Sequence, residues 1–272
     1  MKRSNPERFS FLKGNALSTE QDQTEETQNS SKQSKGSTFG ETVSVIIQAL
    51  ILAVFLRTFI FQPFSIPSGS MKPTLLVGDY LFVSKFSYGY SKYSFPLSPD
   101  LFDGRIWSSE PERGDVAVFK FPPNPAIDYI KRVVGLPGDK IQMRDGILYI
   151  NDQAVKRERA PENYIDDETG RGPVPVFIET LPNGVSYKTL DVNPRSLGDN
   201  TQVFEVPEGH YFMMGDNRDN SADSRFEAGF VPLENFVGRA DVVFFSIKDR
   251  SHPLAVWKWP EDLRASRLFN GL

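Results

Sequence analysis

Two serines in a short segment after an apolar run have the potential for nucleophilic chemistry. Residues 67–75 read PSGSMKPTL and place Ser68 and Ser70 on either side of a glycine. Small residues and a glycine permit a tight, exposed turn that can present a hydroxyl group. Because Ser-Gly-Ser is also a common loop sequence, this segment alone does not establish catalysis.

A lysine in a second segment could act as the base for such a serine. Residues 129–139 read YIKRVVGLPGD and place Lys131 in an apolar, strand-like run. A lysine at such a position usually points to solvent, but if it points inward, burial disfavours the ammonium form and lowers its pKa. Lowering that pKa from ~10.4 to ~8 requires ~3 kcal/mol of desolvation. A neutral amine could then accept the proton of a serine hydroxyl.

A third segment is densely polar. Residues 215–225 read GDNRDNSADSR. An acidic calcium-binding turn is one interpretation, but the arginines interleaved among the acidic residues argue against it. The opposite charges favour internal ion pairs that hold a loop in place.

Composition excludes several other chemistries. The chain of 272 residues has no cysteine, which excludes cysteine proteases, thiolate metal sites and disulfides. The chain has only two histidines, His210 and His252, and so few histidines argue against a histidine zinc site. A Ser-His-Asp triad would have to use one of these two. The net charge of −4 provides no basic field for nucleic acid. We therefore predict no metal, no cofactor and no nucleic-acid partner.

The elements that must position these side chains are predicted to be mainly β. After residue 61 the chain consists of short apolar runs separated by Gly, Pro and Asp, as in LFVSKF, DVAVFKF and FVGRADVVFFSI. We expect an antiparallel β-sheet catalytic domain over residues 62–272. The polar stretch at about 151–203 is expected to be a β-rich insertion on it.

An apolar run before the serine segment predicts a membrane span. Residues 43–61 read VSVIIQALILAVFLRTFIF, and roughly twenty helical residues cross the ~30 Å hydrocarbon layer. We predict one transmembrane helix at 42–61, preceded by a disordered tail at 1–41. A buried core helix and a cleaved signal remain alternatives, although no small-x-small site follows closely. Flanking charges barely decide the orientation.

The last stretch, residues 257–272, reads WKWPEDLRASRLFNGL and could form a short amphipathic helix. Its two tryptophans are compatible with a position at a membrane interface. A helix that caps the core is an equally good interpretation.

Taken together, these segments resemble the bacterial type I signal peptidases (leader peptidases), the serine/lysine dyad family. The resemblance covers the span and residues 64–75, 113–120, 129–139 and 215–225, in the family's order. It implies a membrane-bound serine endopeptidase, a hydrolase that cleaves N-terminal signal peptides from exported preproteins after a small-x-small motif.

The resemblance implies roles for individual residues. Ser70 matches the nucleophile and Lys131 the general base. Ser68 matches the hydroxyl that joins the Ser70 N–H in the oxyanion hole, Ser221 the serine that hydrogen-bonds the lysine, and Gly215 the small residue beside the lysine. Two supporting ion pairs are implied, Asp223 with Arg225 and Arg132 with Asp216. The apolar lining of the substrate pockets is implied to be Phe64, Ile66, Met71, Leu75, Tyr129 and Ile130.

The resemblance also implies partners and a location. The partners are preprotein signal peptides, membrane lipid and a nearby secretion translocon. The location is the bacterial inner (plasma) membrane, with a single span, a cytoplasmic N-terminus and a periplasmic or extracytoplasmic catalytic domain.

Other functions remain to be weighed against this one. A catalytically inactive, membrane-anchored β-domain that acts as a binding module would not need Ser70 or Lys131. A self-cleaving repressor with the same chemistry would need an N-terminal DNA-binding domain, where this chain has a polar tail and an apolar run. A histidine-triad protease would have to use a residue such as His210, which lies beside Glu208-Gly209 in an apparent turn.

Overall fold

The computed structural model describes residues 19–100, 102–166, 170–193, 195–248, 257 and 259–272. The chain divides into two compact units, Met1–Val54 and Phe55–Leu272. Residues 1–18, the start of the predicted tail, lie outside the described residues.

The first long element is the helix α1, Thr19–Phe59. Its window Phe39–Phe59 is long and apolar enough to cross a membrane, and residues 39–57 are exposed, which is unlike a buried core helix. The helix begins at Thr19 rather than at residue 42, so residues 19–41 differ from the expected disordered tail. Glu, Gln and Lys are good helix formers, and an already nucleated helix extends at little cost per residue.

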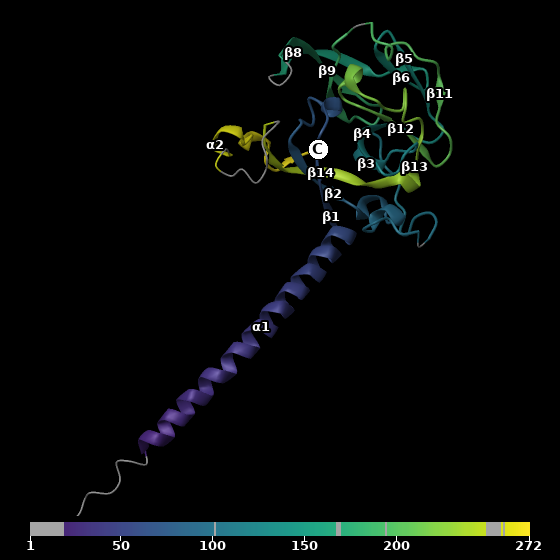
Figure 1. Ribbon diagram of the computed structural model, residues 1–272. Coiled ribbons are helices and arrows are strands. Elements are labelled where there is room, and N and C mark those ends of the chain that lie inside the picture. Colours follow the sequence, from purple (N-terminus) through teal and green to yellow (C-terminus); the bar gives the residue numbers. More distant parts are fainter. Residues whose placement is uncertain (1–18, 101, 167–169, 194, 249–256, 258) are drawn as a thin grey trace, which may run out of the picture. The chain divides into compact units, whose positions relative to one another are not determined.

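An eight-stranded antiparallel sheet forms the centre of the Phe55–Leu272 unit (Figure 1). Its order is β1-β2-β14-β3-β4-β12-β13, and β15 also pairs with the long strand β14. The bounds are β1 Phe61–Ser65, β2 Asp79–Ser84, β3 Val116–Lys120, β4 Asp128–Gly135, β12 His210–Met214, β13 Val231–Pro232, β14 Phe236–Ser246 and β15 Asn270–Gly271.

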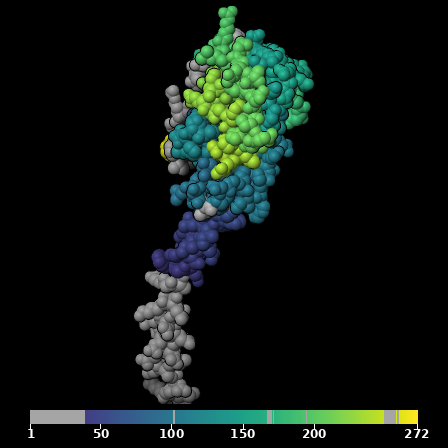
Figure 2. All heavy atoms as spheres, turned by 90° about the vertical axis from the view of Figure 1, so that its right-hand side faces the viewer, coloured from purple at the N-terminus to yellow at the C-terminus, as the bar shows by residue number. Residues whose placement is uncertain are grey.

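Two smaller sheets complete the unit. One has the order β10-β9-β8 and the other β11-β5-β6-β7. Their bounds are β5 Lys140–Arg144, β6 Ile147–Ile150, β7 Gln153–Ala154, β8 Lys156–Asp166, β9 Arg171–Thr180, β10 Ser186–Leu190 and β11 Phe204–Glu205. Strand β11 pairs antiparallel with β5, with Phe204 opposite Ile141. Figure 2 shows teal segments beside green ones on one face of the unit. The predicted mainly β, antiparallel fold is confirmed, and the β8–β10 sheet falls within the stretch at 151–203.

Strand β4 is buried on both faces from Ile130 onward. Ile130 packs in a cluster with Ile66, Met71 and Leu75, whereas Val133 belongs to a second cluster. Burial on both faces explains why residues 129–139 read as a nearly continuous apolar run rather than as an alternating one. A lysine in this strand cannot point to solvent without leaving the core.

The C-terminal stretch is only briefly helical. Helix α2 is Trp259–Asp262, a 3-10 turn follows at Ala265–Arg267, and β15 then joins β14. Proline at the second helical position suits a helix start, but four residues are too few for an amphipathic face. Arg267 instead pairs with Asp79, with Nε 3.0 Å from Oδ1 and Nη2 2.6 Å from Oδ2. The stretch therefore holds the loop that follows the serine segment.

We predict that Arg267→Met lowers the free energy of unfolding by about 3 kcal/mol, because it leaves a buried carboxylate without its guanidinium. Asp79 is fully buried, whereas the Arg239–Asp241 pair is substantially exposed. The control Arg239→Met should therefore cost less than about 1 kcal/mol. Urea unfolding of both variants measures the difference, and equal losses would contradict the structural role of Arg267.

Candidate active site

A short 3-10 turn, Gly69–Met71, carries Ser70 between β1 and β2. Met71 is fully buried and anchors the turn in the core, while Ser70 is 7% exposed. Asn217 holds the turn from the opposite side: its backbone N–H donates to the Ser70 carbonyl at 3.0 Å, and its side-chain amide donates to the Gly69 carbonyl at 2.9 Å. The backbone around Ser70 is therefore fixed from two directions.

Lys131, on β4, lies directly against the Ser70 side chain. Its Nζ is 2.8 Å from Ser70 Oγ and donates to the Ile130 carbonyl at 2.9 Å. The residue is 4% exposed. Burial lowers the pKa of Lys131 to about 8, although the carboxylates of Asp223 and Asp216 act in the opposite direction. A buried, partly neutral amine within hydrogen-bond reach of a hydroxyl has the geometry of a general base and its nucleophile.

Ser68 lies beside this contact. Its Oγ is 3.4 Å from Ser70 Oγ. Both hydroxyls therefore face one small region, in which a reacting carbonyl could sit.

Ser221 does not make the interaction that the resemblance implies. Ser221 Oγ is buried, and the hydrogen bond to Lys131 that the resemblance implies is not formed among the described residues. The Lys131 amine instead contacts Ser70 Oγ and the Ile130 carbonyl. Ser221 packs against Gly215, where an added Cβ would overlap the Ser221 side chain and lie 2.6 Å from the Ser70 carbonyl. Gly215 thus provides the space behind the serine turn.

Both predicted ion pairs are present. Arg132 binds Asp216 through two contacts, Nε to Oδ1 at 2.9 Å and Nη2 to Oδ2 at 2.7 Å, and Thr74 donates to the same carboxylate at 2.5 Å. Arg225 binds Asp223 in the same two-contact manner, at 3.0 and 2.9 Å. All four partners are buried, and two-contact pairing is the arrangement that compensates a buried guanidinium best.

Asp223 also fixes the backbone of its own loop. The Gly215 N–H donates to its Oδ2 at 3.0 Å. Burial alone would raise the pKa of Asp223, but Arg225 and this N–H hold that pKa below its usual value. The carboxylate therefore stays charged under the conditions in which Lys131 is partly neutral.

The structure brings most of the predicted pocket lining together. One cluster contains Phe64, Ile66, Met71, Leu75 and Ile130. Met71 and Leu75 have no exposed surface, so they lie beneath the other members of this cluster. Tyr129 belongs to a different cluster and stacks on Phe121 at 4.5 Å, with its ring centroid 5.1 Å from Lys131 Nζ.

Several further residues support this site, although the sequence motifs assign no role to them. Asn217 lies inside the segment 215–225 and could have been found there. Arg218 binds Glu179 of β9 with two contacts, at 2.7 and 2.5 Å, and Glu179 also accepts from the Tyr187 hydroxyl at 3.1 Å. Glu179 lies in the polar insertion, where no local pattern distinguishes it from solvent-exposed acids.

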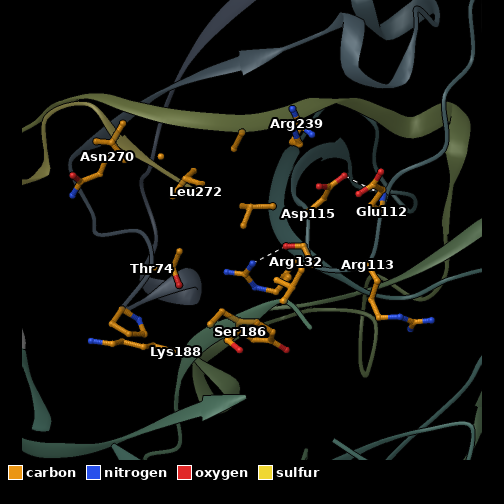
Figure 3. Close-up of a pocket in the computed structure, with 18 of the residues that line it drawn as sticks. Thr74, Glu112, Arg113, Asp115, Arg132, Ser186, Lys188, Arg239, Asn270 and Leu272 are labelled. Carbon is orange, nitrogen blue, oxygen red and sulfur yellow. Dashed lines mark hydrogen bonds between the residues drawn. The ribbon is translucent and has the colours of Figure 1, made fainter. Parts of the chain in front are cut away.

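A separate cleft of about 520 Å³ lies near the Arg132–Asp216 pair. Figure 3 shows Arg132 and Thr74 among its lining residues, together with Asp115, Arg239 and Leu272. Neither Ser70 nor Lys131 belongs to its described lining. Within the described ranges, no group of three His, Asp or Glu side chains is placed to hold a metal ion. His210 contacts the Glu208 carbonyl through Nδ1 at 2.9 Å.

Comparison with known proteins identifies the family. The family model described as signal peptidase, peptidase S26, matches residues 39–245. Signal peptidase I of Rickettsia massiliae (strain Mtu5) is 42% identical over 268 residues, covering 92% of this chain and 98% of its own. Signal peptidase I of Rickettsia canadensis (strain McKiel) is 46% identical over 239 residues, covering 81% and 89%.

A solved structure, the crystal structure of a signal peptidase I from Enterococcus faecalis V583, is 28% identical and covers 48% of this chain and 97% of its own. The TM-score of that superposition is 0.29, so the assignment rests on the sequence comparisons. The matched range contains the serine turn, β4 and the loop at 215–225. The chain therefore belongs to the signal peptidase family, peptidase S26.

Proposed function

We propose that this protein is a membrane-bound type I signal peptidase, a serine endopeptidase that removes N-terminal signal peptides from preproteins with a Ser70/Lys131 dyad. The observation that carries the proposal is the 2.8 Å contact between Lys131 Nζ and Ser70 Oγ, made where burial lowers the pKa of Lys131 to about 8. Family membership supplies the substrate class, and the contact supplies the chemistry.

The geometry supports the following mechanism. The neutral Lys131 amine takes the proton of Ser70 as Oγ attacks the scissile carbonyl carbon. The oxyanion that forms is stabilised by the Ser68 hydroxyl and the Ser70 N–H, a contribution of roughly 3–4 kcal/mol. The Lys131 ammonium then gives its proton to the leaving amine, and an ester to Ser70 remains. Water, deprotonated by the same amine, attacks that ester; the Lys131 ammonium returns the proton to Ser70 Oγ as the ester bond breaks, and the signal peptide leaves with a free carboxylate.

Substrate choice follows from the surroundings of the dyad. The pocket lining of Phe64, Ile66 and Ile130 lies on the fully buried Met71 and Leu75, so the pockets are shallow. A large side chain at the first or third position before the cut would displace packed residues, at a cost of ~1–3 kcal/mol. Small residues such as alanine are therefore favoured at both positions.

A strand edge beside the serine turn offers a place for an extended substrate. Among the described residues β1 pairs with β2 alone, and its other edge is unpaired. A peptide could add to this edge as a further strand, held by main-chain hydrogen bonds. Because β1 ends at Ser65, five residues before Ser70, such a peptide would extend towards Ser70.

Membrane attachment concentrates enzyme and substrate in one plane. The window Phe39–Phe59 of α1 is its proposed anchor. In the Phe55–Leu272 unit, ring contacts also join Phe61, Phe82 and Phe244, and Trp259 packs on Phe245. Aromatic side chains of this kind suit the lipid headgroup region. Lipid and a nearby translocon are the partners we propose besides the preprotein.

The dyad is tested by Ser70→Ala and Lys131→Ala, each of which should abolish cleavage of a preprotein with alanine at the first and third positions before the cut. The double variant should be no worse than either single one, because the two residues act as one unit. Detergent-solubilised protein is incubated with the preprotein, and the new N-terminus is identified by mass spectrometry. Lys120→Ala, on the neighbouring strand β3, is the matched control and should keep its activity. Cleavage by the Lys131 variant would contradict the Ser/Lys mechanism, whereas an absence of cleavage by the unmodified protein would favour the alternative, a catalytically inactive binding domain.

The pH dependence follows from the lowered pKa of Lys131. Below about 8 the side chain is mainly an ammonium ion and cannot accept a proton; above it the amine is mainly neutral. The value of kcat/KM should therefore rise with pH and level off above about 8. Initial rates over a pH series measure this limb. A rise centred near pH 4 would instead indicate a carboxylate base.

The proposed topology places the N-terminus in the cytoplasm and residues 62–272 outside it, where a preprotein's cleavage site emerges. Protease added to right-side-out spheroplasts should digest the catalytic unit and leave an epitope at the N-terminus intact. Lysed spheroplasts are the control, in which the epitope should also be lost. Digestion of the epitope in intact spheroplasts would reverse the proposed topology.

A further inference from the structure

A second lysine lies within the serine segment and has no part in the mechanism above. Lys72 is 4% exposed, and its Nζ contacts both carboxylate oxygens of Asp166, at 3.1 and 3.2 Å. Asp166 is the last residue of β8, in the three-stranded β8–β10 sheet. An ion pair between a buried ammonium and a half-buried carboxylate thus connects the serine turn to a separate sheet.

Stability alone is a poor explanation for such a pair. Removing an ammonium and a carboxylate from water is costly, and apolar side chains of similar volume often fill such a place at no loss of stability. An ion pair instead fixes the relative position of its two groups, because separating them would leave each charge without its partner, which is strongly disfavoured in this environment.

The path of the Lys72 side chain shows what that geometry fixes. Its Cδ and Cε lie 3.3 Å from the point that a Cβ on Gly69 would occupy, so the methylene chain packs across this glycine. The Lys72 backbone N–H also donates to the Gly69 carbonyl at 3.2 Å. Gly69 separates Ser68 from Ser70, so Lys72 covers the peptide unit that orients both hydroxyls.

The β8–β10 sheet is itself held firmly to the opposite side of the site. Glu179 of β9 binds Arg218 with two contacts, and both side chains are buried. The Leu190 N–H of β10 donates to the Asp216 carbonyl at 2.9 Å. The sheet therefore contacts the loop at 215–225 at one place and the serine turn at another.

We propose that Lys72 and Asp166 are positioning residues of the peptidase reaction, through which the β8–β10 sheet holds the Ser70 turn in register with Lys131. The inference deepens the proposed function and rests on it. The β8–β10 sheet, which lies in the polar stretch at 151–203, then has a structural role in the active site.

The test compares Lys72→Met, Asp166→Asn, the double variant and Lys72→Arg. Misplacing a catalytic group lowers the rate of chemistry more than it lowers binding, so kcat of Lys72→Met should fall at least ~10-fold while KM changes by less than ~2-fold. Asp166→Asn should behave similarly, and the double variant should be no worse than the more impaired single one, because the residues act as a unit. Lys72→Arg should recover most of kcat, since a guanidinium can also bind the carboxylate with two contacts.

Lys188→Met is the matched control, because Lys188 and Glu162 form an exposed ion pair within the same sheet. It should leave kcat and KM unchanged. Thermal unfolding of every variant identifies any that fail to fold. If Lys72→Met does not fold, the kcat of Asp166→Asn decides the matter.

Three results would overturn the inference: a wild-type kcat in folded Lys72→Met or Asp166→Asn, a loss confined to KM, or a Lys72→Arg variant as slow as Lys72→Met. Ser70→Ala separates this inference from the proposed function. If Ser70→Ala still cleaves, the proposed function fails. If Ser70→Ala is inactive while Lys72→Met keeps its kcat, only the positioning role fails.

Discussion

The burial of one amine against one hydroxyl is the constraint on which the rest of the site depends. Lys131 is placed in a strand with apolar clusters on both faces, where an ammonium ion is poorly solvated. The same burial that makes the charged form unfavourable makes the neutral form available to Ser70. The lowered pKa of Lys131 therefore depends on its buried position in β4, because a lysine at the surface would have its ordinary pKa.

A neutral base in the core is useful only if the charged groups around it are themselves compensated. Arg132, Arg218 and Arg225 are all buried near the dyad, and each binds a carboxylate with two contacts. These pairs connect β4, the loop at 215–225 and the β8–β10 sheet. Both oxygens of the Asp216 and Asp223 carboxylates are bound in these pairs, and the Lys131 amine contacts Ser70 Oγ and the Ile130 carbonyl instead. The Lys72–Asp166 pair extends the same arrangement to the serine turn.

Much of this could be predicted from the sequence, because local segments carry it. The mainly β fold, the apolar helix and the meeting of Ser70 with Lys131 follow from strand-like runs, span length and motif resemblance. The helical conformation of residues 19–41 was not predicted, since their polar composition suits both disorder and a helix extended from an apolar segment. The expected Ser221 bond to Lys131 is not formed, because the Lys131 amine contacts Ser70 Oγ and the Ile130 carbonyl instead, and the sequence does not show which of several nearby acceptors a lysine reaches. Glu179 and Asp166 could not be identified, because their partners lie far away in the sequence.

The ionisation of Lys131 is the most direct test of this account. Protein labelled with ¹³C at the lysine Cε positions can be titrated by NMR, with the Lys131 resonance assigned from its absence in Lys131→Ala. The structure predicts an inflection near a pKa of about 8, well separated from those of surface lysines. An inflection for Lys131 at the ordinary value of ~10.4 would show that the amine is solvated and charged, and would contradict its proposed role as the base.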